Sequence, residues 1–327
     1  MLSDDEDLAP ARKPSPKGVT GRDVPLDVEL AEQHYPALTR YLGRLEAAYQ
    51  ANSACTNLDA NFLPTLVEGL NAADPALKLE ILTFPLWIPS KPSRLAQRLE
   101  ESLRQPSNWH AVLDDGGHRT ALSVRYAPQT HDVSVLLVES MRSQFRHGRL
   151  MSKALKRIAS DLQDKLDPKA PPLRLHLKFL PSRAQIGDGC TIFALSAVKK
   201  MASDPAIAAL HQQAFTELQT ATSTTTSKPL KARETPLSLL KHATSLRVVK
   251  KVLNAMDDPS VAERAVNKRG ETLVQRVKSH IVKRVTDKKI SFSNSHEAKR
   301  IQIIRSALAQ LTADKSRAGS DAPTQGL

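Results

Sequence analysis

The sequence has 327 residues, of which 40% are hydrophobic and only 4% aromatic, and it carries a formal net charge of +13. Such a chain is long enough to bury a full core of mainly aliphatic side chains, and its longest apolar run is far too short to span a bilayer. The two cysteines, Cys55 and Cys190, exclude a disulfide framework, and no CxxC or HExxH pattern supports a zinc site.

The net charge is concentrated in the C-terminal third of the chain. Positions 228–305 hold nineteen Lys or Arg and seven Asp or Glu, so nearly the whole surplus lies there. Such a surface favours a polyanion, and the alternative is a solvated basic face that serves solubility. Phe292 is the only aromatic residue of this stretch, so it offers no stacking platform and we do not expect nucleic acid as a partner.

Composition also divides the chain into segments. Residues 1–25 open with an acidic run and continue with prolines and lysines, a polar stretch that predicts disorder. Residues 26–227 carry the hydrophobic patterns of a folded core, residues 228–313 form a basic and mainly helical region, and residues 314–327 are predicted to be a disordered tail.

Hydrophobic periodicity predicts the order of helices and strands. Helices are predicted at 27–50, 63–71, 93–104, 150–166, 190–201, 206–218, 237–255, 261–285 and 296–311. Strands are predicted at 77–84, in two runs joined by a tight turn within 109–126, and at 133–139, 173–179 and 290–293, with a loop at 220–227. This order predicts an α/β (α+β) fold with a central mixed sheet.

Cys190 lies where a glycine-rich turn enters a helix. The preceding strand alternates apolar and polar residues, whereas Ile192, Leu195, Val198 and Met201 recur every third residue after the cysteine. A thiol at a helix start faces unpaired backbone N–H groups and the positive end of the helix dipole, and both favour the thiolate. The pattern is that of a cysteine nucleophile, with a buried structural thiol as the alternative.

A nucleophilic cysteine needs a base and a group that orients the base. His118 starts the second strand of the predicted hairpin, and Glu139 ends the apolar strand that follows. We therefore predict His118 as the base and Glu139 as its orienting carboxylate. His110 is the rival base, and the rival acids Asp115 and Asp132 lie in turns, where Asp is common.

Four ordered motifs extend this pattern along the chain. They are His118 with its alternating strand, Ser134–Glu139, Gly189–Leu195, and the pair Lys241-His242 followed by Val266–Arg276. Together they resemble the YopJ family of type III secreted acetyltransferase effectors, over roughly residues 28–305. Ser123 departs from this family, whose strand after the histidine usually carries Asp at that position.

The resemblance implies an enzyme that transfers acetyl from acetyl-CoA to Ser, Thr or Lys of host immune-signalling proteins, in ping-pong chemistry. The implied catalytic residues are His118, Glu139 and Cys190, with Gln185 at the oxyanion hole as in related cysteine proteases. The residues implied to line the CoA arm are Gln185, Ile186 and Thr191. The resemblance implies no metal, and it implies delivery into a host cell by a type III apparatus.

It further implies activation by inositol hexakisphosphate, a host polyphosphate, bound by a helical regulatory unit that the N-terminal helices can join. The implied phosphate-binding residues are Arg40, Arg44, Lys241, His242, Arg247, Lys250 and Lys268. Lys241 is also the implied site of self-acetylation. The residues alone leave two other functions open, namely a ubiquitin-like-protein protease with the same triad and an inactive protein that binds polyanions.

Overall fold

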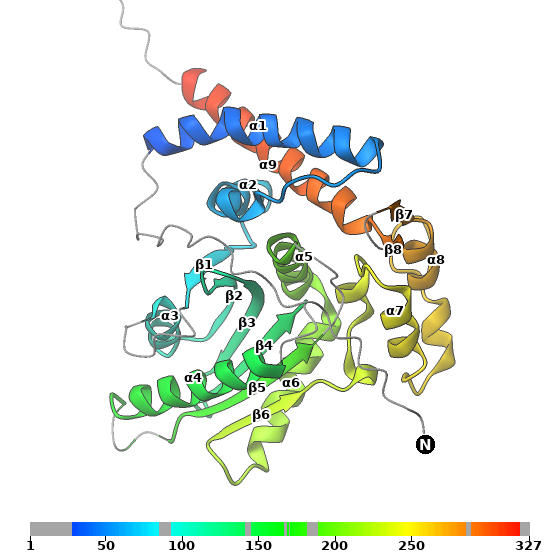
Figure 1. The fold of residues 1–327 in the computed structure, drawn as a ribbon. Helices are drawn as coiled ribbons and strands as arrows, with labels where there is room; N and C mark the ends of the chain where they lie inside the picture. The colour runs from blue at the N-terminus through cyan, green and yellow to red at the C-terminus, as the bar shows by residue number, and fades with distance from the viewer. Residues whose placement is uncertain are drawn as a thin grey trace, which may run out of the picture.

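The computed structural model describes residues 28–84, 93–140, 145–166, 169, 171–181, 189–285 and 289–320. A six-stranded sheet with strand order β1-β2-β3-β4-β5-β6 lies at its centre (Figure 1). Its strands are β1 (Glu80–Thr83), β2 (Ser107–Asp114), β3 (Arg119–Ala127), β4 (Asp132–Glu139), β5 (Arg174–Pro181) and β6 (Thr225–Pro229). β2 pairs antiparallel with β3 and β3 with β4, whereas the other pairs are parallel, so the predicted mixed sheet is confirmed.

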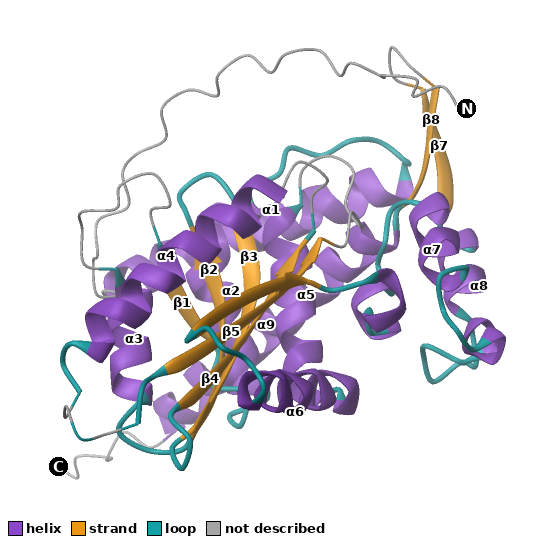
Figure 2. Ribbon diagram, turned by 90° about the horizontal axis from the view of Figure 1, so that it is seen from below, coloured by secondary structure: helices purple, strands orange, loops and turns teal. Residues whose placement is uncertain are grey.

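Two helices cover each face of the sheet (Figure 2). α3 (Arg94–Ser102) and α4 (Phe145–Gln163) provide the crossovers that parallel pairs require, and they pack on one face. α5 (Cys190–Ser203) lies over β2 and β3 on the other face, and α6 (Pro205–Gln219) lies over β4 and β5 beside it. β6 falls in the predicted loop because it has no apolar pattern and joins the sheet edge through its backbone.

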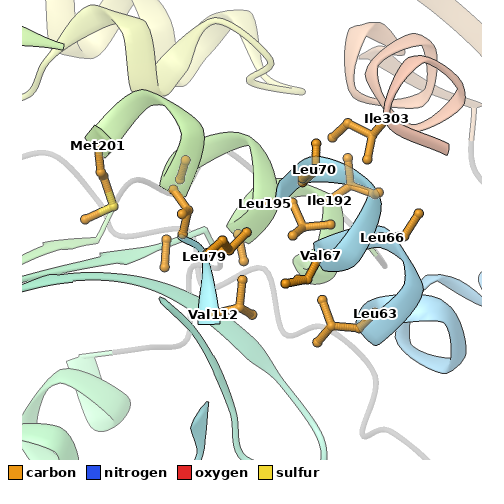
Figure 3. Close-up of a cluster of buried hydrophobic side chains, with 14 of the residues drawn as sticks. Leu63, Leu66, Val67, Leu70, Leu79, Val112, Ile192, Leu195, Met201 and Ile303 are labelled. Atoms are coloured by element: carbon orange, nitrogen blue, oxygen red, sulfur yellow. The ribbon is translucent and has the colours of Figure 1, made fainter. Parts of the chain in front are cut away.

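α5 is the centre of the main hydrophobic cluster. Its Ile192 and Leu195 lie among side chains from α2 (Leu63–Ala73), β2 and α9 (Ser295–Ser320), as Figure 3 shows. Both side chains are at most 1% exposed. Because burial of apolar area is the main stabilising contribution to folding, this cluster fixes the position of the helix that begins with Cys190.

The first two helices of the described chain and the last one pack together above α5. α1 (Val28–Gln50) and α2 both contact α9, so N-terminal helices pack with the C-terminal one (Figure 1). A buried network secures this contact: Tyr41 donates a hydrogen bond to Asp59 (2.8 Å), and Arg300 Nε lies 2.8 Å from the same carboxylate. No helix in the described ranges is long and apolar enough to cross a membrane.

The basic region is less helical than the sequence predicts. The predicted helix 237–255 is a 3₁₀ turn at Leu237–Leu240 followed by α7 (Leu246–Leu253), which Ser245 caps. The predicted helix 261–285 is a 3₁₀ turn at Pro259–Glu263, then α8 (Leu273–Lys278), then β7 (Ile281–Val285), which pairs with β8 (Lys289–Ser293). Gly270 explains one break, since its φ of +74° cannot continue a helix.

The structure covers part of the predicted C-terminal tail but none of the predicted N-terminal segment. Residues 1–25, predicted to be disordered, lie outside the described residues. At the other end α9 continues to Ser320, past residue 313 where the tail was predicted to begin. The extension from 314 to 320 contains one Lys, one Arg and one Ala, which favour helix, beside Asp, Gly and two Ser, which do not, so composition alone did not predict it.

Candidate active site

Cys190 is the first residue of α5, as the sequence predicts, and its side chain is partly exposed. Gly189 precedes it with a φ of +151°, a conformation that a residue with a Cβ adopts only with strain. The backbone N–H groups of the first helical turn have no partners within the helix. They therefore provide a positive electrostatic environment at the thiol.

His118 and Glu139 lie together at one end of the sheet. The turn before β3 places the histidine, because Asp115 Oδ1 accepts hydrogen bonds from the backbone N–H groups of Gly117 (2.9 Å) and His118 (2.6 Å). His118 Nε2 is 2.8 and 3.0 Å from the two carboxylate oxygens of Glu139, which ends β4 and is 3% exposed. The imidazole also forms a hydrogen bond with Cys190, and because Glu139 occupies Nε2, Nδ1 is the nitrogen left for the sulfur.

The pKa values of the pair are displaced toward a thiolate and an imidazolium. Burial acts to lower the pKa of His118, but hydrogen bonds and charge from Cys190 and Glu139 outweigh it and raise the pKa to about 10. Burial likewise opposes ionisation of Cys190, yet His118 and Arg119 outweigh it, and the pKa of the thiol is lowered. Both shifts favour the thiolate–imidazolium ion pair over the neutral pair in this largely buried site.

Arg119 is a contributor that the sequence analysis missed. Its backbone N–H donates a hydrogen bond to Cys190, and its guanidinium adds favourable charge near the sulfur. The side chain is 13% exposed and is held by Asp114, whose Oδ1 lies 3.1 Å from Arg119 Nε. The sequence feature that could have identified Arg119 is its position directly after the predicted base, His118.

The rival residues have other environments. His110 is buried on β2, and burial together with the charge of Arg125 lowers its pKa to about 4. Asp132 is 1% exposed and pairs with Arg174 at 2.7 Å, which anchors β4 to β5. Asp115 forms the turn described above. Of the candidate bases and acids, the structure brings only His118 and Glu139 to Cys190 among the residues that it describes.

The residues predicted to line the CoA arm are placed only in part. Gln185 and Ile186 lie outside the described residues. Thr191 follows the nucleophile on α5, and its side chain is 2% exposed. In the described ranges no group of three or more His, Cys, Asp or Glu side chains could hold a metal ion.

A second feature is a basic cavity of about 300 Å³ beside α5. The basic residues that line it are Lys199, Lys200, Lys241, His242, Arg276 and Lys299. Burial, then repulsion from Lys199, Lys241 and Lys200, lowers the pKa of Lys299 to about 8. Burial, then Lys200 and Arg276, lowers the pKa of Lys241. Cations crowd here without enough carboxylates, which is the environment that a bound polyanion would stabilise.

The structure divides the predicted phosphate-binding residues. Lys241 and His242 line this basic cavity, whereas Arg247 and Lys250 line a separate groove on α7. The other three are exposed residues outside both linings, with Arg40 and Arg44 on α1 and Lys268 in the loop before α8.

Four basic residues of the cavity were not among the phosphate-binding residues predicted from the sequence, namely Lys199, Lys200, Arg276 and Lys299. The sequence analysis assigned no role to the two lysines at the end of α5. Lys299 follows them by about a hundred positions, so only the packing of α9 against α5 brings it there. Phe193 also lines the cavity and stacks on His296 of α9, with ring centroids 5.7 Å apart.

Comparisons with known proteins identify a family and several similar folds. A family model described as YopJ Serine/Threonine acetyltransferase matches residues 38–306. A search of curated proteins gives no significant match. Among solved structures, "AvrA delL154 with IP6, CoA" is similar, with a TM-score of 0.64, 22% sequence identity, and coverage of 84% of this chain and 98% of that chain.

Two structures of HopZ1a are also similar. The complex with IP6 has a TM-score of 0.58 and 19% identity, with coverage of 86% of this chain and 98% of that chain. The complex with IP6 and CoA has a TM-score of 0.55 and 19% identity, with coverage of 85% and 98%. At these identities the likeness establishes the shared fold.

Proposed function

The chain belongs to the YopJ serine/threonine acetyltransferase family, and from this premise we propose that it moves acetyl from acetyl-CoA through Cys190 to Ser, Thr or Lys side chains. One observation carries the proposal: hydrogen bonds run from Glu139 through His118 to Cys190. A thiolate beside an imidazolium that a carboxylate orients is suited to attack an acyl carbon.

In the first half-reaction the Cys190 thiolate attacks the carbonyl carbon of the thioester. The bond between this carbon and the sulfur of CoA breaks, and the departing thiolate takes the proton of the His118 imidazolium. The products are CoA as a thiol, an acetyl group on Cys190 and a neutral His118. Because one thioester replaces another, little free energy separates donor from intermediate.

In the second half-reaction neutral His118 takes a proton from the acceptor hydroxyl or amine. The acceptor then attacks the acetyl carbon, and Cys190 leaves as a thiolate, which restores the ion pair. Glu139 stabilises the imidazolium at this point and keeps Nδ1 directed toward the reacting atoms. Gln185 and the backbone N–H of Cys190 would bind the developing oxyanion in both halves.

We further propose that inositol hexakisphosphate binds in the basic cavity and activates the enzyme. Its phosphates would neutralise the cations gathered there, among them Lys241 and Lys299. The similar structures of AvrA and HopZ1a were determined with IP6, which supports the assignment. Lys241 is the proposed self-acetylation site, since a lowered pKa increases its neutral, nucleophilic fraction.

The proposed acceptors are immune-signalling proteins of a host cell, which the protein would enter through a type III secretion apparatus. This assignment follows from the family to which the chain belongs. A compact activator that the host supplies would keep the enzyme idle before entry. The protease alternative uses the same triad, and it differs by needing no CoA.

The test is self-acetylation with radiolabelled acetyl-CoA in the presence of inositol hexakisphosphate. Cys190→Ala should abolish labelling, and Glu139→Gln should slow it by on the order of 10²-fold or more because the imidazolium loses its counter-charge. Omitting the polyphosphate should reduce labelling of the wild type.

Cys55→Ala is the matched control, because Cys55 is also a partly exposed free thiol but lies in another part of the fold. Its labelling should equal that of the wild type. Equal labelling by Cys190→Ala and the wild type would refute the acyl-enzyme. Cleavage of a ubiquitin-like conjugate without CoA would favour the protease.

A further inference from the structure

A small cavity adjoins the catalytic base on the side of the sheet that α4 covers. It has a volume of about 10 Å³, which is room for a single group the size of a water molecule or a methyl. His118 lines it, and its apolar walls are Phe84, Leu113, Leu137 and Met151. These four side chains belong to the hydrophobic cluster beneath α3 and α4 and are at most 7% exposed, so packing fixes the size of the cavity.

An apolar group suits this cavity better than a water molecule does. A buried water needs about two to four hydrogen-bond partners. Asp115 also lines the cavity, but its Oδ1 accepts bonds within its own turn, and the ring nitrogens of His118 face Glu139 and Cys190. That leaves the hydroxyl of Thr120 among the polar residues that line it. We therefore expect a methyl group as the occupant.

The position of the cavity indicates which methyl group of the reaction can reach it. Cys190 is not among the described residues that line it, whereas the methyl of an acetyl group on Cys190 lies only two bonds from the sulfur. An acceptor hydroxyl must come within about 3 Å of His118 Nδ1 to give up its proton. The carbon atoms next to that hydroxyl then lie beside the imidazole, which adjoins the cavity.

We propose that this cavity binds the γ-methyl of an acceptor threonine, with Leu137 and Met151 as specificity-determining residues. The inference rests on the proposed acetyl transfer and names the acceptor that the site prefers. Serine has no methyl to fill the cavity, and lysine presents its amine on an unbranched chain. As the threonine oxygen forms its bond to the acetyl carbon, its proton passes to His118 Nδ1, and the bond from that carbon to the Cys190 sulfur breaks.

The experiment is a competition between peptides of one sequence, Ala-Ala-X-Ala-Ala, in which X is threonine, serine, lysine or allothreonine. The wild-type chain acts on the mixture with acetyl-CoA and saturating inositol hexakisphosphate, and mass spectrometry measures the products. Threonine should be preferred over serine by roughly 10- to 100-fold in kcat/KM, the factor expected for one methyl in an apolar pocket.

Allothreonine is the matched probe. It has the same atoms as threonine but the opposite configuration at the carbon that carries the hydroxyl. When its hydroxyl faces His118, its methyl points away from the cavity. It should therefore be acetylated no faster than serine.

A variant tests the same cavity from the side of the protein. Met151→Phe adds bulk to the cavity wall and should bring the ratio of threonine to serine product close to one. Ile158→Phe is the control and should keep the wild-type ratio, since Ile158 is also buried on α4 but is not among the described residues that line the cavity. The peptide competition needs no variant, so it decides the proposal even where Met151→Phe does not fold.

Several results would overturn the proposal. They are equal products from threonine and serine, equal products from threonine and allothreonine, a preference for lysine, or an unchanged ratio in a folded Met151→Phe. Labelling of Cys190 by acetyl-CoA without any peptide is measured alongside. A labelled Cys190 that transfers nothing to the threonine peptide would refute the cavity assignment and leave the acyl-enzyme intact, whereas an unlabelled Cys190 would refute both proposals.

Discussion

One face of the central sheet is apolar where α5 covers it and polar where α6 covers it. Under α5 the sheet presents apolar residues such as Val112 and Ala121, which meet Ile192 and Leu195. Under α6 the same face presents polar side chains that are at most 4% exposed, namely Ser123, Ser134, His176 and Lys178. The packing of α5 on the sheet is therefore stabilised by burial of apolar area, and the packing of α6 by hydrogen bonds between buried polar side chains.

His211 of α6 organises the polar half. It is 1% exposed, with Nε2 2.8 Å from Ser123 Oγ and Nδ1 2.8 Å from Ser134 Oγ. A neutral imidazole donates through one nitrogen and accepts at the other, so the two serines satisfy it completely. The apolar contacts of Val112, Ala121, Ile192 and Leu195 involve no titrating side chain, so their contribution to stability should not depend on pH.

The largest expected effect comes from breaking the apolar half. Leu195→Ala should lower the free energy of unfolding by about 2–5 kcal/mol, because it removes a fully buried side chain and leaves a cavity between α5 and α2 (Figure 3). Urea unfolding at pH 7 and pH 5 measures this loss, which should be the same at both. Leu195→Met keeps the volume and should cost less than about 1.5 kcal/mol. A loss that changes with pH would contradict the comparison.

The apolar half was predictable from the sequence, whereas the polar half was not. Ile192, Leu195, Val198 and Met201 show helical spacing, and all four are at most 1% exposed. That pattern is local. The partner of Ser123 lies 88 positions away, on a helix whose existence was predicted but whose contacts were not.

Local sequence patterns do not reveal contacts between distant parts of the chain, which explains why some residues of the candidate active site and the basic cavity were not predicted. Cys190, His118 and Glu139 were found because each stands at the end of a strongly patterned element. Lys299 was missed, since its proximity to the end of α5 arises from the way α9 packs. β7 was missed because Ile281–Val285 continues a helical spacing, and only pairing with β8 makes it a strand.

A smaller effect is expected where α2 meets α9 above the apolar half. A Cβ on Gly69 would lie 2.5 Å from both Cα and Cβ of Ala307, so Gly69→Ala should destabilise the protein by roughly 1–3 kcal/mol. Gly43→Ala on α1 is the matched control, since nothing lies within 4 Å of its added Cβ. It should be neutral or stabilising by about 0.5–1 kcal/mol. Thermal unfolding distinguishes them, and equal effects would refute the close contact.

The smallest effect concerns acid, which should weaken the polar half and not the apolar half. Burial, then the charges of Arg125, His110 and Lys178, lowers the pKa of His211 to about 3, against about 6.5 in an unfolded chain. The folded protein therefore binds fewer protons, and the stability from neutral His211 is lost as pH falls below about 6.5. The pair of His118 and Cys190 acts in the other direction: with a pKa near 10, His118 stabilises the fold below about pH 6.5 and loses this contribution as pH rises toward 10.

His211→Gln tests the predicted loss of stability in acid, because an amide can form hydrogen bonds with the two serines but does not titrate. Between pH 7 and pH 5 the variant should lose about 1–2 kcal/mol less stability than the wild type. His131→Gln is the control, since His131 is also a histidine but lies outside this layer, in the turn between β3 and β4. An unchanged slope in His211→Gln would mean that other buried histidines carry the acid sensitivity instead. They are His110 and His176, whose pKa values are lowered to about 4, and His242, whose pKa is lowered to about 3. Stability independent of pH in the wild type over this range would refute the contrast between the two halves.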